Sequence, residues 1–358
     1  MIQTEKELAQ WLARLKDASW IAMDTEADSL HAYPEKICLL QFSLPSGDTL
    51  IDPLAGVDLD PLWAALESRT MILHGADYDL RLMKRIYQFI PHAIFDTMLG
   101  ASMLGYKQLG LGNLVEAKLG KTLEKSSQKA NWARRPLTEK MVAYAMNDTR
   151  YLQPLAHELA SELDIKGRLE WHEQWCNKLI NDCTNTPPPD PDSLWRIKGS
   201  SKLSERALAV LKHVWQWREK QAIQANRPLF FILKHDTLLK VSSTAAEGKE
   251  CEHLLPRKWP QHRKDEFMEE VQKGLDVPDD QLPTHPPKVR HARPTKEELD
   301  RFEILQKHRD GVAAQLEIDP TIIASKAILI SLANDWKRAS EKIMPWQVDI
   351  MAPILKGL

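Results

Sequence analysis

The chain has 358 residues, which is enough for two or three domains, and 43% hydrophobic with 27% charged residues excludes a disordered protein. Its net charge of −2 conceals an asymmetry. Residues 1–190 carry 20 Lys and Arg against 26 Asp and Glu, whereas residues 195–275 carry 16 against 10. An acidic first half and a basic later segment predict that the two parts have different roles.

Cysteine usage and apolar runs indicate the compartment. The chain contains four cysteines without Cys-x-x-Cys pairing or a companion histidine spacing, so neither a disulfide framework nor a structural zinc site is expected. Residues 1–15 have the pattern of an amphipathic helix rather than of a secretory signal, and no run of 18 apolar residues occurs. We therefore expect a cytoplasmic protein without membrane contact, and a monomer, with a ring of subunits as the alternative.

Apolar patterns place the first elements in chain order. Short apolar runs bounded by Gly, Pro and Asp predict strands at residues 20–25, 37–44, 49–54 and 71–76. The first three lie close together, which favours an antiparallel meander. Helical periodicity predicts helices at residues 1–15, 60–68, 77–89 and 137–163, the last with Thr138 as its N-cap. Strands that alternate with helices predict an α/β fold with a mixed sheet.

Two proline-rich segments divide the chain. Residues 183–198 include "CTNTPPPDPDS" and residues 278–295 include "PTHPP", so both are predicted linkers. The predicted domains are residues 1–182, 199–277 and 296–358.

The two later pieces lack strand signals and resemble each other. Each has an Arg-acid pair, an alanine four residues after the arginine, and a proline about ten residues after it, with one residue of insertion between the registers. The matched positions are Arg218, Ala222 and Pro228 in one piece and Arg309, Ala313 and Pro320 in the other. Duplication of a small helical bundle is favoured over chance.

The first chemical signal is the pair Asp24 and Glu26, which ends an apolar run in "WIAMDTEADS". Side chains alternate faces along a strand, so these two carboxylates project from the same face. The explanation that requires no function is a solvated surface strand. Because like charges this close repel each other, the pair requires another reason if it is buried.

Further acids follow in two helices. Asp77 and Asp79 lie at the predicted start of a helix after "HGA", where the helix dipole favours negative charge, and the bland explanation is capping. Tyr144 and Asp148 are four residues apart and share one helix face. Each signal is weak alone, but their ordered occurrence is rare. A cluster of oxygen ligands without His or Cys favours Mg²⁺ or Mn²⁺, and two such ions suit phosphodiester displacement.

The segments "DTE", "HGADYD" and "YAMND" resemble the three motifs of the ribonuclease D family and of the wider DEDDy group of 3′-to-5′ exonucleases. The resemblance continues through "FDTMLGASML", "KSSQKANWARRPLT" and "YLQPL", and so covers about the first 180 residues. It implies an RNase H-like exonuclease domain. Residues 200–275 resemble the helicase-and-RNase-D C-terminal (HRDC) domain, and residues 297–358 look like a second, divergent copy.

The resemblance implies roles for individual residues. The implied metal-binding acids are Asp24, Glu26, Asp79 and Asp148, and Asp77 falls outside the pattern. Asp24 would bridge two divalent cations, Mg²⁺ or Mn²⁺, Glu26 and Asp148 would complete the site that holds the attacking water, and Asp79 would support the second ion. Tyr144 would orient the water. The sequence departs from the commoner family pattern at "ADSLHAYP" and at Asn131-Trp132, which leaves the metal ligands intact but puts substrate preference in doubt.

A basic run precedes the helix of Tyr144 and Asp148. Residues 118–135 contain six Lys and Arg against one acid, Glu124. Such a run is usually a solvated loop, but an acidic metal site needs nearby cations to hold a polyanion. We expect substrate contacts from His74, Lys125, Gln128, Lys129, Arg134 and Arg135.

Three tryptophans of the basic segment could stack on bases, namely Trp195, Trp215 and Trp217. We favour core packing for them, and expect at most one of Trp215 and Trp217 to face the core because they are two apart on a helix.

The leading functional hypothesis is a metal-dependent 3′-to-5′ exoribonuclease that releases nucleoside 5′-monophosphates, with RNA as the partner. The family resemblance implies structured RNA substrates such as tRNA precursors. A DNA 3′-to-5′ exonuclease is a close alternative, because no residue can be tied to a 2′-hydroxyl. A non-catalytic RNA-binding scaffold is a third possibility, and the presence of all four acids argues against it.

Overall fold

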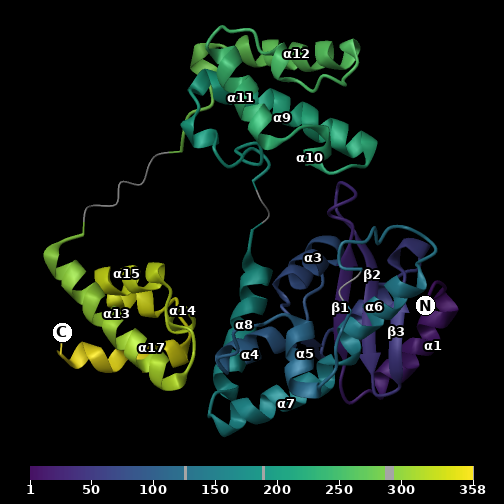
Figure 1. The fold of residues 1–358 in the computed structure, drawn as a ribbon, viewed down its shortest axis with the longest axis vertical. Coiled ribbons are helices and arrows are strands. Elements are labelled where there is room, and N and C mark those ends of the chain that lie inside the picture. The colour runs from purple at the N-terminus through teal and green to yellow at the C-terminus, as the bar shows by residue number, and fades with distance from the viewer. Residues whose placement is uncertain (125–126, 188–189, 287–293, 358) are drawn as a thin grey trace. The chain divides into compact units, whose positions relative to one another are not determined.

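A computed structural model describes residues 1–124, 127–187, 190–286 and 294–357, which form two units (Figure 1). The first unit comprises the described residues of Met1–Ala27, Ile37–Thr186 and Ala292–Leu358. The second comprises those of Asp28–Lys36 and Pro187–His291. The C-terminal helices therefore pack in one unit with the N-terminal α/β part, although they are distant from it in the sequence.

A mixed sheet organises the N-terminal part of the first unit, and its strand order within the described residues is β3-β2-β1-β4-β5. The strands are β1 (Ala22–Ala27), β2 (Ile37–Leu44), β3 (Gly47–Ile51), β4 (Thr70–Leu73) and β5 (Ala93–Asp96). β1, β2 and β3 are antiparallel neighbours, and β4 pairs parallel with both β1 and β5. The predicted meander and the α/β class are confirmed. Prediction missed β5, because four residues make too short an apolar run.

The helices of this part are α1 (Glu5–Lys16), α2 (Asp60–Leu66), α3 (Asp77–Tyr87), α4 (Thr97–Met103), α5 (Leu111–Leu119), α6 (Glu139–Arg150), α7 (Leu152–Ile165) and α8 (Leu169–Asn185), with a 3₁₀ turn at Pro53–Ala55. Thr138 caps α6 as predicted and accepts a hydrogen bond from the Met141 amide. The prediction of one helix over residues 137–163 was wrong, because α6 ends before Tyr151. Pro154 has no N–H to offer the Arg150 carbonyl, so it is tolerated only in the first turn of a new helix.

Both faces of the sheet are covered, and the two faces have separate cores. On one face, Trp11 of α1 packs against Phe42 of β2 with ring centroids 5.0 Å apart, in a cluster that includes Met83 of α3. On the other face, α6 lies against β1, β2 and β3, and Ala145 of α6 packs in a cluster with Leu39 of β2. Because α6 is fixed across β1, side chains of the two elements can meet.

The remaining elements are helical. The second unit contains α9 (Glu205–Ala225), α10 (Leu229–Ile232), α11 (His235–Ala246) and α12 (Gln261–Leu275), with 3₁₀ turns at Ser200–Lys202, Glu252–Leu254 and Asp279–Gln281. The C-terminal helices are α13 (Lys296–Leu316), α14 (Pro320–Ile323), α15 (Lys326–Asn334), α16 (Trp336–Ser340) and α17 (Pro345–Met351), followed by a 3₁₀ segment at Ala352–Gly357. None of the described helices has both the length and the apolar character needed to cross a bilayer.

The two helical pieces share one local geometry. A long helix ends at a left-handed residue eight positions after the arginine, Asn226 in α9 and Glu317 in α13. The buried arginine then donates to a carbonyl fifteen positions later, from Arg218 to Leu233 at 3.2 Å and from Arg309 to Ala324 at 2.7 Å. These shared features support duplication.

The predicted one-residue insertion between the two copies was wrong. The short helices α10 and α14 have their N-caps, Pro228 and Asp319, at the same distance from the arginine. The proline occupies the N-cap in the first copy, whereas Pro320 occupies the first helical position in the second. Proline suits both positions, because neither requires its missing N–H.

Core packing was correctly favoured for the three tryptophans. Trp195, Trp215 and Trp217 are all buried in one cluster of the second unit. The expectation that only one of Trp215 and Trp217 faces the core was wrong, because α9 is covered by α10, α11 and α12 on several sides. A helix that is surrounded in this way buries residues two positions apart.

The C-terminal helices attach to the N-terminal part through a mixed polar and apolar contact. Arg168 donates to the Met103 carbonyl at 2.7 Å and to the Leu316 carbonyl at 2.8 Å, so one guanidinium joins the ends of α4 and α13. Trp171 of α8 stacks on Trp346 of α17 with ring centroids 4.8 Å apart and planes 13° apart. The Trp346 amide also donates to the side chain of Gln174.

We predict that Gly105→Ala loosens this attachment. Gly105 has a φ of +88°, and a Cβ there would overlap the Glu317 carbonyl oxygen. The matched control is Gly120→Ala, because Gly120 has a φ of +62° and open space around the added carbon. The control should lose about 1–2 kcal/mol of stability from backbone strain alone. Gly105→Ala should melt at least about 4 °C lower than the control and expose α13 to limited proteolysis. Equal melting temperatures would contradict the contact.

Candidate active site

Three carboxylates converge from β1 and α6. Asp24 and Glu26 leave β1 on one face, and Asp148 reaches them from α6. One oxygen atom from each of the three lies within 4.8 Å of the others. The pairing predicted from a one-residue spacing on a strand and a second acid on the later helix is therefore present in three dimensions.

Asp79 joins the same cleft from the first turn of α3. Its position after "HGA" predicted the first turn of a helix, and the family resemblance implied that it belongs with the other acids. It is buried and accepts a hydrogen bond from the Thr25 hydroxyl, but it lies outside the group of three. Asp77 is exposed and pairs with Arg81 at 2.9 Å. The two acids are two residues apart and therefore project from different faces of α3, and only Asp79 faces the cleft.

Tyr144 lies one helical turn before Asp148 and shares its face. Its hydroxyl donates to the Asp148 carboxylate, and its ring centroid lies 6.0 Å from that of Trp132. Burial, followed by the charges of Asp148, Glu26 and Asp24, raises the pKa of Tyr144 above its ordinary value. The phenol therefore stays protonated at neutral pH and acts as a hydrogen-bond donor.

The cleft that contains these groups has a volume of about 420 Å³. Burial, with the charges of Asp79, Asp148 and Glu26, raises the pKa of Asp24 well above its ordinary value. Burial and the neighbouring carboxylates raise the pKa of Glu26 to about 9. Burial also raises the pKa of Asp148 to about 7 and that of Asp79 to about 6, although hydrogen bonds from Tyr144 and Thr25 oppose these two shifts. Without a counter-charge, the cluster therefore resists full ionisation.

The donor set fits a divalent cation. All candidate ligand atoms are carboxylate oxygens, which hard cations such as Mg²⁺ prefer. Gln41 lies directly opposite Asp24 in the β1–β2 register, so its side chain leaves the sheet on the same face. Gln41 is fully buried, and neither of its amide atoms has a hydrogen-bond partner among the described residues. A hydrated cation beside Asp24 would neutralise the repelling carboxylates, and its water could form hydrogen bonds with the Gln41 amide.

Asp96 is a residue that sequence reasoning missed. It ends β5, caps α4 by accepting from the Met98 and Leu99 amides, and also accepts from the Gly75 and Ala76 amides at 3.0 and 2.8 Å. It thereby holds the turn that leads into α3 and positions Asp79. Its sequence signal was an aspartate directly before a helical run in "FDTMLG". Gln41 had a comparable signal, as a lone amide within an apolar strand.

The residues expected to contact substrate lie in different environments. His74 and Gln128 line the cleft, and the His74 ring lies 2.9 Å from the Thr97 hydroxyl. Lys129 and Arg134 are exposed, and Lys125 lies outside the described residues.

The expectation that Arg135 contacts substrate is not supported. Its guanidinium pairs with the buried Asp52 and donates to the carbonyls of Cys38 and Trp132 at 2.7 Å. All three of its nitrogen atoms are therefore used within the fold.

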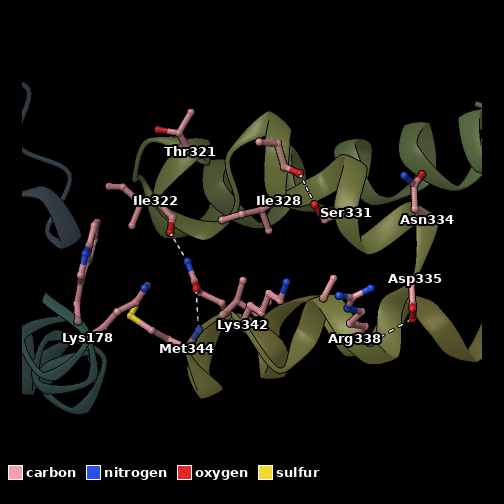
Figure 2. Close-up of a pocket in the computed structure, with 15 residues that line it drawn as sticks. Lys178, Thr321, Ile322, Ile328, Ser331, Asn334, Asp335, Arg338, Lys342 and Met344 are labelled. Carbon is pink, nitrogen blue, oxygen red and sulfur yellow. Dashed lines mark hydrogen bonds between the residues drawn. The ribbon is translucent and has the colours of Figure 1, made fainter. Parts of the chain in front are cut away.

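A larger cavity, of about 750 Å³, lies between α8 and the C-terminal helices (Figure 2). Asp335 is the single carboxylate among its lining residues, and it caps α16 by accepting from the Arg338 amide. Figure 2 shows Lys342 and Ile328 on opposite walls of this cavity. Because it offers no cluster of acids, size alone does not identify the reactive site.

Comparisons with known proteins agree with this geometry. Residues 1–164 match the model of a 3′-5′ exonuclease family, and residues 207–247 match that of the HRDC domain. The chain is 31% identical to ribonuclease D of Jannaschia sp. over 79% of this chain and 76% of that protein. It is also 31% identical to ribonuclease D of Gluconacetobacter diazotrophicus, where the match spans 68% of this chain and only 63% of the relative.

Among solved structures, the fold is similar to that of Escherichia coli RNase D, which is described as an exoribonuclease involved in structured RNA processing. The TM-score is 0.75 at 26% identity, over 100% of this chain and 97% of that one.

We predict that the metal-free protein loses stability as the pH rises. The folded pKa of Glu26, about 9, lies above its unfolded value near 4, so the folded state binds more protons and destabilisation grows between these two values. The melting temperature in EDTA should therefore fall from pH 5 to pH 9. Added Mg²⁺ should raise it strongly at pH 8 and little at pH 5, because protonated carboxyls do not bind the ion.

Glu26→Gln should flatten the pH slope and remove most of the Mg²⁺ effect, whereas Asp77→Asn, at the exposed acid, should change neither. A full Mg²⁺ stabilisation in Glu26→Gln would refute the assignment of this cluster.

Proposed function

We propose a function for this chain from the premise that it belongs to the ribonuclease D family. The proposed function is a metal-dependent 3′-to-5′ exoribonuclease that hydrolyses RNA to nucleoside 5′-monophosphates. The observation that carries the proposal is that carboxylate oxygens of Asp24, Glu26 and Asp148 lie within 4.8 Å of one another. These acids lie in the part of the chain that matches the 3′-5′ exonuclease family.

Each residue of the cleft has a role in the proposal. Asp24, Glu26 and Asp148 would hold the divalent cations, with Asp24 contributing to both ion sites and Asp79 supporting the second. The cations, Mg²⁺ or Mn²⁺, would lower the pKa of water and neutralise phosphate charge. Tyr144 orients the attacking water through its hydroxyl, which the protonated phenol can do as a donor. His74 and Gln128 line the cleft, where they would contact the terminal nucleotide.

The proposed substrates are structured RNAs with a single-stranded 3′ end, such as tRNA precursors. Support comes from the described role of the Escherichia coli relative in structured RNA processing. All four cysteines are buried and none is joined in a disulfide, which supports a reducing compartment, and we place the activity in the cytoplasm. The domain boundaries at residues 1–182, 199–277 and 296–358 and the monomeric state are part of the same proposal.

The experiment that tests the function compares 5′-labelled and 3′-labelled RNA with and without EDTA. A 3′-to-5′ exonuclease converts the 3′ label to mononucleotide at once and shortens the 5′-labelled strand stepwise, and EDTA stops both. A matched DNA strand in parallel separates a ribonuclease from a deoxyribonuclease. Metal-independent cleavage, or loss of the 5′ label first, would refute the proposal.

We predict that Asp24→Asn abolishes hydrolysis and largely spares RNA binding, because the asparagine removes the shared ligand but not the cleft. Tyr144→Phe should lower kcat by about 100-fold with a small change in KM, because it removes one aligned hydrogen bond. Measured kcat and KM with a single-stranded 3′ end, together with RNA affinity in EDTA, check both. Substantial turnover by Asp24→Asn would remove the mechanism.

We predict that substitutions of the neighbouring Arg134 and Arg135 affect different properties, RNA binding for the first and stability for the second. Arg134→Ala should weaken RNA binding and lower the slope of log affinity against log salt by about 0.7, the value for one phosphate contact on a single strand, and Lys129→Glu should act in the same direction. Arg134→Ala should leave the melting temperature unchanged. Arg135→Ala should cost about 3 kcal/mol of stability, because it leaves the buried Asp52 without its partner. An unchanged salt slope in both Arg134→Ala and Lys129→Glu would contradict phosphate contact.

A further inference from the structure

The cavity of about 750 Å³ between α8 and the C-terminal helices shares no lining residue with the catalytic cleft. A second cavity, of about 370 Å³, shares Trp175, Thr321 and Ile322 with it and continues to α4. The two cavities therefore form one continuous groove within the first unit, here named the C-terminal groove. A compact ligand would fill either cavity alone, whereas an extended occupant can use both.

Apolar side chains form the floor of the C-terminal groove. Four of them are partly exposed and pack against one core cluster, namely Trp175, Ile322, Ile328 and Ile343. The first helical copy holds Thr237 at the position equivalent to Ile328, counted from the buried arginine. The fold of the bundle therefore does not require an isoleucine there, and the apolar floor needs another reason.

The walls of the groove are held in place by a buried glutamine. The Gln347 side chain donates to the Ile322 carbonyl at 3.0 Å and accepts from the Met344 amide at 2.9 Å. One amide group thus joins α14 to the start of α17. A surface that is already ordered binds a partner with a smaller entropic cost.

Positive side chains outnumber carboxylates along the groove. Its charged lining residues are Lys107, Lys178, Arg338 and Lys342 on the positive side and Asp319 and Asp335 on the negative side. Both carboxylates cap helices, α14 and α16, by accepting hydrogen bonds from backbone amides. Because the positive ends of these helix dipoles offset the two acids, a partner meets a net positive surface.

Two of the cations are available to a partner. Arg338 and Lys342 are exposed, and neither forms an ion pair among the described residues, whereas Lys178 pairs with Asp182 at 2.8 Å. Figure 2 shows Lys178 at one end of the first cavity, Arg338 at the other end and Lys342 between them. Cations that are spread out in this way match several acidic side chains of one segment better than the single anionic group of a small ligand.

We propose that the C-terminal groove docks an acidic amphipathic helix of a partner protein. The apolar face of that helix, with side chains at positions i, i+3, i+4 and i+7, lies on the isoleucine floor. Its Asp and Glu side chains pair with Arg338 and Lys342. The proposal is independent of the exoribonuclease function, because the groove and the catalytic cleft have no residue in common.

Other occupants fit the groove less well. A single-stranded nucleic acid is disfavoured, because isoleucines offer no planar face on which bases stack. The linker of this chain is disfavoured as well, because its residues 288–293 include three Lys and Arg and no acid, and like charges repel.

The test uses the full chain and a designed, fluorescein-labelled helical peptide with Leu at positions i, i+3, i+4 and i+7 and with Glu and Ala elsewhere. Anisotropy should show that this peptide binds more tightly than a peptide with Lys in place of Glu. Arg338→Glu with Lys342→Glu should weaken binding of the acidic peptide at least about fivefold, because two attractions become repulsions. The same variant should bind the lysine peptide more tightly than wild type does.

The apolar floor is tested separately. Ile328→Thr should weaken binding of the acidic peptide at least about threefold, because it removes apolar surface that the peptide covers. Threonine is the residue that the first helical copy holds at this position, so the bundle should still fold, and an unchanged melting temperature checks this.

Matched controls come from the same helices. Ile330→Thr changes an isoleucine of α15 that is 44% exposed and does not line the groove. Lys326→Glu with Lys337→Glu makes the same change of net charge at two exposed lysines outside the lining. Neither control should change affinity for the acidic peptide by more than about twofold. Equal losses in the groove variants and in the controls overturn the proposal, as does binding to wild type weaker than about 1 mM.

Two further outcomes also overturn it. If wild type self-associates in sedimentation and Arg338→Glu with Lys342→Glu does not, the groove joins two copies of this chain. If single-stranded adenylate RNA displaces the peptide in EDTA and binds the charge-reversed variant more weakly, the groove holds nucleic acid. Hydrolysis of RNA with Mg²⁺ is measured separately and decides the exoribonuclease function whatever the peptide does.

Discussion

Repulsion among carboxylates is the constraint on which the rest of the structure depends. Asp24, Glu26 and Asp148 meet within 4.8 Å, and burial together with mutual repulsion raises the pKa of Glu26 to about 9. Such a cluster destabilises the folded state unless a counter-charge is present. The scaffold must therefore contribute enough stability elsewhere to hold the acids together, and it does so by fixing the two elements that carry them.

That scaffold acts through backbone and core rather than through the acids themselves. α6 lies across β1, β2 and β3, and Ala145, next to Tyr144, is buried against the sheet. On the other side, Asp96 accepts four backbone N–H groups and fixes the turn before α3, while Thr25 holds Asp79. Asp79 is thus oriented by the Thr25 hydroxyl and by the turn that Asp96 fixes, while the Asp96 carboxylate is satisfied by the four amides.

The two helical copies show how one fold serves different contacts. Both use a buried arginine to bind the carbonyl after a short helix, Arg218 in the first copy and Arg309 in the second. The second copy packs against the N-terminal part of the first unit, where Arg168 joins the ends of α4 and α13. In the first copy the short helix α10 leaves Phe230 and Phe231 exposed. The two copies share the internal arginine and differ in their surface residues, which is the pattern expected of duplication followed by specialisation.

Local sequence determined the elements that depend on local chemistry. The alternation of side chains on a strand placed Asp24 and Glu26 on one face, Thr138 placed the start of α6, and a four-residue spacing placed Tyr144 beside Asp148. Family resemblance of the motifs then indicated which acids belong together. Tertiary structure alone decided that Arg135 pairs with Asp52, that Gln41 lies opposite Asp24, and that the last helices pack on the first domain. The physical reason is that these contacts join residues far apart in the chain, so no local period or spacing encodes them.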